Sequence, residues 1–156
     1  MHNDKVFFHN LMGISLDRPT KGAYIGGKIN ILYDDTSLMP NIFVHELTHY
    51  VTAAIAKGNY PTWFAEGIAL YMEYYILDYE WGEELGNVSH IYMTDLNDRF
   101  YDLDEYTAYR KSFEIVRDII EEKGVEKLNQ FLRELGKGKS FFKTFERYYG
   151  NILYKY

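Results

Sequence analysis

The most chemically informative stretch of the sequence is the pentapeptide His45-Glu46-Leu47-Thr48-His49. Its two histidines are four residues apart, and a helix places such residues on one face with their Cβ atoms about 5–6 Å apart. Two imidazoles at this spacing can bind one zinc ion, and Glu46 would then lie beside the metal, where it can accept a proton from water. The pattern therefore predicts a zinc centre with a general base. The alternative is a metal-free helix with two partly buried histidines.

Composition limits what the rest of the chain can be. With 156 residues, of which 47% are hydrophobic, the chain is long enough for one folded domain, which we assign to residues 1–156. There is no cysteine, so disulfides and thiolate-bound zinc are excluded and the metal ligands must be His, Asp or Glu. The net charge of −6 argues against a nucleic-acid-binding protein.

No segment of the chain has the pattern of a targeting or anchoring sequence. Residues 1–5 lack an apolar run, and no stretch has the length of a membrane span. We therefore expect neither a signal peptide nor a transmembrane helix in this chain, and we expect no membrane partner. A leader trimmed from a longer precursor stays an open alternative, and the compartment and the oligomeric state do not follow from the sequence.

The N-terminal part of the chain predicts short strands. A brief apolar run at residues 6–8 indicates a strand, and the Pro and Gly content of residues 17–22 indicates a loop. Residues 29–33 alternate so that Ile29, Ile31 and Tyr33 share one face, which is typical of a half-buried strand.

The pentapeptide belongs to a predicted helix that should begin near residues 34–37, with Pro40 in its first turn. This helix should end near Lys57, with Gly58 as its left-handed stop. The histidines lie next to an apolar stripe formed by Phe43, Leu47, Val51 and Ala54. We expect a second helix from Trp63 to about Tyr79, with Thr62 as its N-cap.

The C-terminal half predicts three more helices. Asp102 and Glu105 resemble a capping box that opens the first of them, which should close at Gly124. Its stripe comprises Tyr106, Tyr109, Phe113, Val116 and Ile120. The next helix should cover residues 125–135, and the last should cover 140–150, capped by Ser140.

Two segments taken together resemble a known family. The pentapeptide is followed by Pro61–Ala69, which reads P-x-W-x-x-E-G-x-A. This combination is similar to the gluzincin metallopeptidases, and within them to the peptidase-MA-like group and the minigluzincins. The resemblance implies a zincin-like α+β fold, with a small N-terminal sheet over the active-site helix and a mostly helical C-terminal half. It also implies a zinc cofactor (Zn2+) held by His45, His49 and Glu66, and a peptide or protein substrate.

The sequence departs from thermolysin-type relatives at one position. Those relatives carry an aspartate four residues after the third ligand, where it orients a histidine, and this chain has Leu70 there. A ligating histidine needs a partner for its second ring nitrogen. Glu73, two helical turns beyond Glu66, is a candidate for that role, and a solvent-facing position on the second helix is the equal alternative.

The resemblance also implies a mechanism. Three protein ligands leave a fourth position open, which is the signature of catalytic zinc, and Glu46 becomes the general base. Gluzincins supply a downstream tyrosine or histidine to the oxyanion, and Tyr109 matches the family's tyrosine at the start of the third helix. Tyr106 and then His90 are the next candidates, and a packing role is the alternative for each. The strand at residues 29–33 is a candidate edge for an extended substrate.

Two charged regions have alternative interpretations. Residues 73–105 hold ten acidic side chains and one basic side chain, Arg99. A solvated acidic surface is the expectation because EF-hand spacing is absent, and the alternative is a calcium site formed by Asp95, Asn97, Asp98, Asp102 and Asp104. The last twenty residues hold five basic groups and one acid. We expect them to form a packed terminal helix rather than a membrane-facing one.

The sequence therefore predicts a zinc-dependent peptidase. Three alternatives stay open: a zinc hydrolase of a non-peptide amide or ester, a metal-binding module without peptidase activity, and a helical interaction protein without metal. The presence of Glu46 argues against the inactive module, because a site without chemistry has no need of a base beside the metal.

Overall fold

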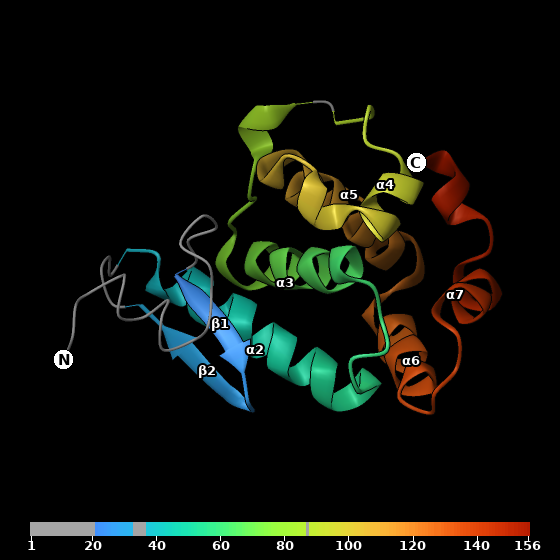
Figure 1. Cartoon of the computed structure of the whole chain (residues 1–156), viewed down its shortest axis with the longest axis horizontal. Coiled ribbons are helices and arrows are strands. Elements are labelled where there is room, and N and C mark those ends of the chain that lie inside the picture. Colours follow the sequence, from blue (N-terminus) through green and yellow to red (C-terminus); the bar gives the residue numbers. More distant parts are fainter. Residues whose placement is uncertain (1–20, 33–36, 87) are drawn as a thin grey trace.

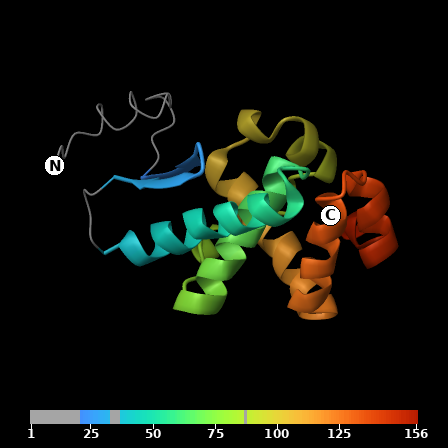
Figure 2. The same cartoon turned by 90° about the horizontal axis from the view of Figure 1, so that it is seen from below.

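The computed structural model describes residues 21–32, 37–86 and 88–156. Its N-terminal element is an antiparallel hairpin of β1 (Gly22–Ile25) and β2 (Lys28–Ile31), in which Gly22 pairs with Ile31. The two-residue turn is Gly26-Gly27, and both glycines have positive φ, the backbone conformation that this tight turn requires. The hairpin packs along one side of the helix α2 (Met39–Ala56), as Figures 1 and 2 show.

The predicted strand at residues 29–33 is confirmed as β2, although it begins one residue earlier and ends at Ile31. Tyr33, the predicted strand at residues 6–8 and most of the predicted loop at 17–22 lie outside the described residues. The partner strand β1 had no clear signal, because Gly22 and Ala23 are small and its two large apolar residues, Tyr24 and Ile25, are adjacent and do not alternate.

Helices make up most of the remaining described chain, so the architecture is α+β as expected. After α2 come α3 (Thr62–Leu77), α4 (Met93–Asp98), α5 (Glu105–Lys123), α6 (Val125–Leu135) and α7 (Phe141–Tyr149). Short 3-10 turns lie at η1 (Glu83–Leu85), η2 (Phe100–Asp102) and η3 (Ile152–Lys155). The predictions for α6 and α7 are confirmed, including the cap position Ser140 and the stops Gly136 and Gly150.

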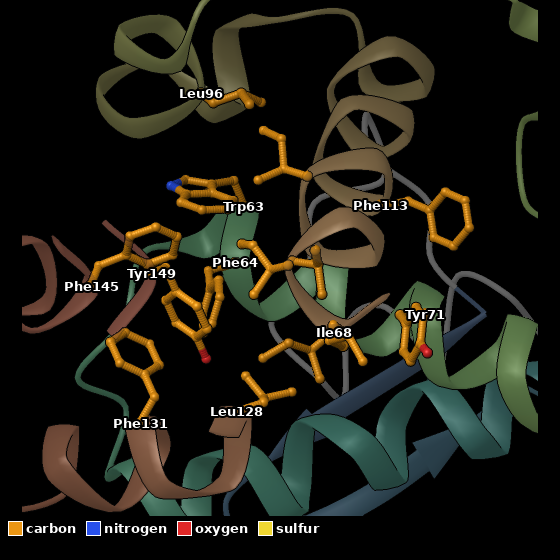
Figure 3. Packing of buried hydrophobic residues seen from close by; sticks show 14 of the residues in the cluster. Trp63, Phe64, Ile68, Tyr71, Leu96, Phe113, Leu128, Phe131, Phe145 and Tyr149 are labelled. Carbon is orange, nitrogen blue, oxygen red and sulfur yellow. The ribbon is translucent and has the colours of Figure 1, made fainter. Parts of the chain in front are cut away.

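Helix α3 is the centre of the molecule. It lies between α2 and α5 and packs most extensively against α5 (Figure 1). Trp63 and Phe64 are fully buried, and the Phe64 ring centroid lies 5.6 Å from that of Phe131. Figure 3 shows these rings within one aromatic core. A Cβ at Gly67 would lie 2.4 Å from the carbonyl oxygen of Ser112, so α3 and α5 approach as closely as only glycine allows.

The ends of α2 and α3 differ slightly from the predictions. Helix α2 ends at Lys57, which itself takes the left-handed conformation at φ 55°, and Gly58 follows at φ 71°. The assignment of Thr62 as N-cap of α3 is wrong. Pro61 occupies that position and Thr62 is the first helical residue, because the extended backbone of Pro61 leads directly into the helix.

The capping box assigned to Asp102 and Glu105 is also wrong. The N-cap of α5 is Asp104, whose carboxylate accepts a hydrogen bond from the backbone N–H of Thr107 at 3.0 Å. Asp102 belongs instead to the 3-10 turn η2, so the helix begins at Glu105. Of the two aspartates at this junction, Asp104 therefore caps α5 and Asp102 lies in the turn before it.

The apolar stripe of α2 faces solvent. Phe43, Leu47 and Val51 expose 48%, 38% and 45% of their surface, and Ala54 is exposed as well. A helix usually turns such a stripe towards the core. Here the buried α2 residues are mostly polar or small: Glu46, Thr52 and Ala56. The inward side of α2 is therefore the side that carries the chemistry.

The predicted packed C-terminal helix is confirmed. Phe141, Phe145 and Tyr149 of α7 are buried in the aromatic core. No helix within the described parts of the chain is both long and apolar enough to cross a bilayer.

Candidate metal centre

Three side chains from α2 and α3 converge at one point. His45 and His49 lie one turn apart on α2, with ring centroids 4.7 Å apart. Glu66, in the second turn of α3, places Oε2 3.2 Å from Nε2 of His45 and 3.4 Å from Nε2 of His49. One donor atom from each residue lies within 4.8 Å of the others, and within the described residues this is the one His/Asp/Glu group that could hold a metal ion.

The donor set fits a zinc ion. Ligand atoms about 2.0–2.1 Å from a tetrahedral zinc lie about 3.3 Å from one another. The separations of 3.2 and 3.4 Å between the imidazole nitrogens and the Glu66 oxygen are close to that value. Two imidazoles and one carboxylate also match the ligand types of catalytic zinc centres. The three predicted residues are therefore together, and their arrangement is suited to the metal.

Glu73, two turns after Glu66 on α3, contacts the His45 ring. Its Oε1 lies 2.8 Å from Nδ1 of His45, and the Glu73 side chain is buried. A ring nitrogen held by a carboxylate fixes the orientation of the imidazole and leaves Nε2 directed at the metal position. Of the two readings that the sequence left open for Glu73, the structure thus gives the partner of His45 and not a solvent-facing residue.

The electrostatics of the cluster favour positive charge. Burial by itself lowers the pKa of His45, but the carboxylates of Glu66 and Glu73 outweigh it and raise the pKa to about 10. Burial by itself raises the pKa of Glu66, but the hydrogen bonds and charges of His45 and His49 lower it to about 2. The carboxylates of Glu66 and Glu73 therefore stabilise positive charge at this position.

Glu46 lies between α2 and the hairpin. It is buried, with 7% of its surface exposed, and the backbone of Tyr24 in β1 lies near its carboxylate. Burial raises the pKa of Glu46 above its ordinary value, although the charges of His45 and His49 counteract part of the rise. A Cβ at Gly22 would lie 2.8 Å from Oε1 of Glu46, so β1 approaches the carboxylate closely at this glycine.

Tyr109 reaches the cluster from α5. Its hydroxyl lies near the Glu66 carboxylate, and it lines a pocket together with His45 and Glu46. Burial, followed by the negative charges of Glu66 and Glu105, raises the pKa of the phenol above its ordinary value. The phenol therefore stays a hydrogen-bond donor at neutral pH.

The other two candidate donors lie elsewhere. The Tyr106 ring stacks on Trp81 with centroids 5.5 Å apart and exposes 58% of its surface. His90 is exposed and lines neither of the two pockets beside the cluster. Of the three candidates, only Tyr109 is at the site.

A comparison with protein families agrees with this geometry. The family model of the peptidase MA superfamily matches residues 27–153 of the chain. The chain belongs to this superfamily. No curated protein and no solved structure gives a significant match.

In this member of the peptidase MA superfamily, the cluster separates two pockets. One, of about 230 Å³, is lined by His45 and Glu46 together with Gly22 of β1. The other, of about 270 Å³, is lined by His49 and Glu66 together with Tyr24 of β1. Strand β1 therefore borders both sides of the metal position, while β2 borders neither. The expectation that residues 29–33 form the substrate edge is not supported, because β1 lies between β2 and the cleft.

Sequence reasoning missed several residues of this site in the peptidase MA chain. Gly22 and Tyr24 of β1 carry no recognisable motif, and their place at the cleft depends on the packing of the hairpin against α2. Asn41 lines the pocket on the His45 side. Its signal was present in the sequence, because it stands four residues before His45 and a helix places such residues on one face.

Proposed function

We propose that this chain is a zinc-dependent peptidase of the gluzincin type, close in plan to the minigluzincins, with His45, His49 and Glu66 as the metal ligands. The observation that carries the proposal is the buried Glu46 carboxylate beside a His/His/Glu cluster, in a chain of the peptidase MA superfamily. A base in that position has a use only if a water molecule is to be activated next to it.

In this proposal the metal ligands and Glu46 have different roles in peptide hydrolysis. Zinc bound by the cluster would supply a Lewis acid that polarises the scissile carbonyl and lowers the pKa of water to about 7. Glu46 accepts a proton from the attacking water and delivers it to the leaving nitrogen. Burial raises the pKa of Glu46 above its ordinary value, and this makes the carboxylate a stronger proton acceptor.

Glu73 and Tyr109 hold and complement the reacting groups. Glu73 keeps the His45 ring in one orientation through its Nδ1. The Tyr109 hydroxyl, protonated and beside Glu66, is the group we assign to donate to the oxyanion that develops on the substrate.

An extended peptide would bind along β1. Since β1 borders both pockets, a peptide lying beside this strand places one flank of its scissile bond in each of them. Tyr24 of β1 lines the pocket on the His49 side, and its backbone lies near the Glu46 carboxylate.

The proposal is tested by zinc content measured beside hydrolysis of a mixed peptide library. We expect about one zinc per chain, loss of hydrolysis on chelation, and recovery when zinc is added back. His45→Ala should lose most of the metal, whereas the exposed His90→Ala is the matched control and should keep it.

A second variant separates metal binding from chemistry. Glu46→Gln should retain zinc and fold while hydrolysis falls by several orders of magnitude, because the base is gone. Near-normal turnover in Glu46→Gln, or unchanged zinc in His45→Ala, contradicts the proposal.

A further inference from the structure

Three buried polar atoms have no hydrogen-bond partner in the described parts of the chain: Asn41 Nδ2, Trp63 Nε1 and Tyr149 Oη. Leaving a buried donor unpaired costs folding stability. Trp63 and Tyr149 belong to the aromatic core, where their large rings compensate by burying apolar surface (Figure 3). Asn41 has no such compensation, because its side chain is small and polar.

Asn41 lies in the catalytic cleft. It is in the first turn of α2, one turn before His45 and on the same face, and it lines the 230 Å³ pocket with His45 and Glu46. Three carboxylates line the same pocket, those of Glu46, Glu73 and Glu105, and none of them accepts a hydrogen bond from the Asn41 amide. Asn41 therefore lines a pocket open to a substrate, while its Nδ2 atom has no hydrogen-bond partner within the described parts of the chain.

The missing partner must be a hydrogen-bond acceptor, since the unpaired atom is an N–H donor. A half-turn about the Cβ–Cγ bond exchanges the amide nitrogen and oxygen without moving the helix, so the donor can be presented to the pocket at little cost. An extended peptide beside β1 directs every second main-chain carbonyl to the same side, about every 6.6 Å, so acceptors of the right kind would lie along this wall.

We propose that Asn41 is a substrate-binding residue whose side-chain N–H donates to a main-chain carbonyl oxygen of the peptide, on the His45 side of the cleft. This inference rests on the proposed peptidase function. It assigns the residue to one flank of the scissile bond, because Asn41 lines the pocket of His45 and Glu46 and does not line that of His49 and Glu66.

A substrate-binding role predicts opposite effects on stability and on catalysis. Asn41→Leu removes an unpaired buried donor at similar side-chain size, so the melting temperature should stay the same or rise while kcat/KM falls about tenfold, the effect of one lost hydrogen bond. Tyr149→Phe is the matched control. It removes another unpaired buried donor far from the cleft, and kcat/KM should not change. Asn41→Ala is the second variant in case leucine does not fit.

A peptide series locates the acceptor. Peptides shortened residue by residue from either end are compared in the wild type and in Asn41→Leu. The tenfold loss should disappear once the peptide lacks the accepting carbonyl, and it should do so from one end only. Binding of a labelled, uncleaved peptide to zinc-loaded Glu46→Gln and to the double variant Glu46→Gln, Asn41→Leu should show a similar loss in Kd.

Each possible result either supports or overturns the proposal that Asn41 binds the substrate. Unchanged kcat/KM and Kd in both Asn41 variants overturn the inference while leaving the peptidase proposal intact. An equal loss for every peptide, down to the shortest, overturns it in favour of a structural role. A wild type that neither binds nor cleaves any peptide removes the peptidase proposal and this inference together.

Discussion

Helix α3 reaches the metal centre from the interior of the molecule, whereas α2 reaches it from the surface. On α3, Trp63, Phe64 and Ala69 are fully buried, and Glu66 and Glu73 project from the same helix into the cluster. On α2 the largest apolar side chains point to solvent, and the buried side carries the general base.

The two helices are therefore held by different means. Core packing fixes α3, through the ring contacts of Phe64 and the close approach of Gly67 to α5. Helix α2 is held at its sides and at its C-terminal end, where Asn59 donates to the carbonyls of Leu135 and Lys139, at 2.8 Å each. The lesson is that a rigid core helix can carry a ligand and its supporting carboxylate, while a surface helix can keep polar chemistry on its inward side.

The largest expected effect tests how α3 is anchored. Phe64→Ala should lower the free energy of unfolding by about 3–5 kcal/mol, because the cavity opens at the centre of the aromatic core. Phe43→Ala, on the solvent-facing stripe of α2, should change it by no more than about 0.5 kcal/mol. Denaturant unfolding of both variants measures the difference. Similar losses for the two would show that α2 is packed as tightly as α3.

The second effect concerns the residue that α5 contributes. Tyr109→Phe should lower kcat by a factor that corresponds to about 2.7–4 kcal/mol of transition-state stabilisation, because an oxyanion donor is lost while the ring remains. The Michaelis constant, zinc content and melting temperature should be almost unchanged. Tyr106→Phe is the control, since that ring lies on Trp81, away from the cluster. Full turnover in Tyr109→Phe would leave the phenol with no role beyond its contact with Glu66.

The third effect tests the contact that joins the two helices at the site. Glu73→Gln should weaken zinc affinity about 10–100-fold, because the His45 ring loses the carboxylate that orients it. Competition with a zinc chelator measures the affinity, and the exposed Glu83→Gln serves as the control. Equal affinity in both variants would mean that packing alone orients His45.

The smallest expected effects come from replacing glycine by alanine at two positions, Gly67 and Gly22. Gly67→Ala forces α3 away from α5 and should cost about 1–2 kcal/mol of stability. Gly22→Ala instead places a methyl group within 2.8 Å of Oε1 of Glu46, so it should lower kcat about tenfold with a smaller change in stability. Unfolding curves and steady-state kinetics on both proteins make the comparison. If Gly22→Ala lost only stability, the contact of β1 with Glu46 would have no part in catalysis.

Local patterns in the sequence predicted much of the helical framework. The bounds of α6 and α7 followed from apolar spacing and from glycines placed after each helix. The pairing of His45 with His49 followed in the same way, because residues four apart in a helix meet whatever surrounds it. Glu66 was identified through the resemblance of its segment to a family, and the fold does bring it to the histidines.

Only the tertiary structure decided the features that depend on distant parts of the chain. The apolar stripe of α2 did not predict which side of the helix faces the interior. The hairpin and α3 cover its polar side, and the stripe faces solvent. Glu73 meets His45 across 28 residues, and Tyr109 rather than Tyr106 faces Glu66 because of how α5 packs on α3. Spacing along one helix sets which residues share a face, whereas the direction in which that face points is set by partners far away in the sequence.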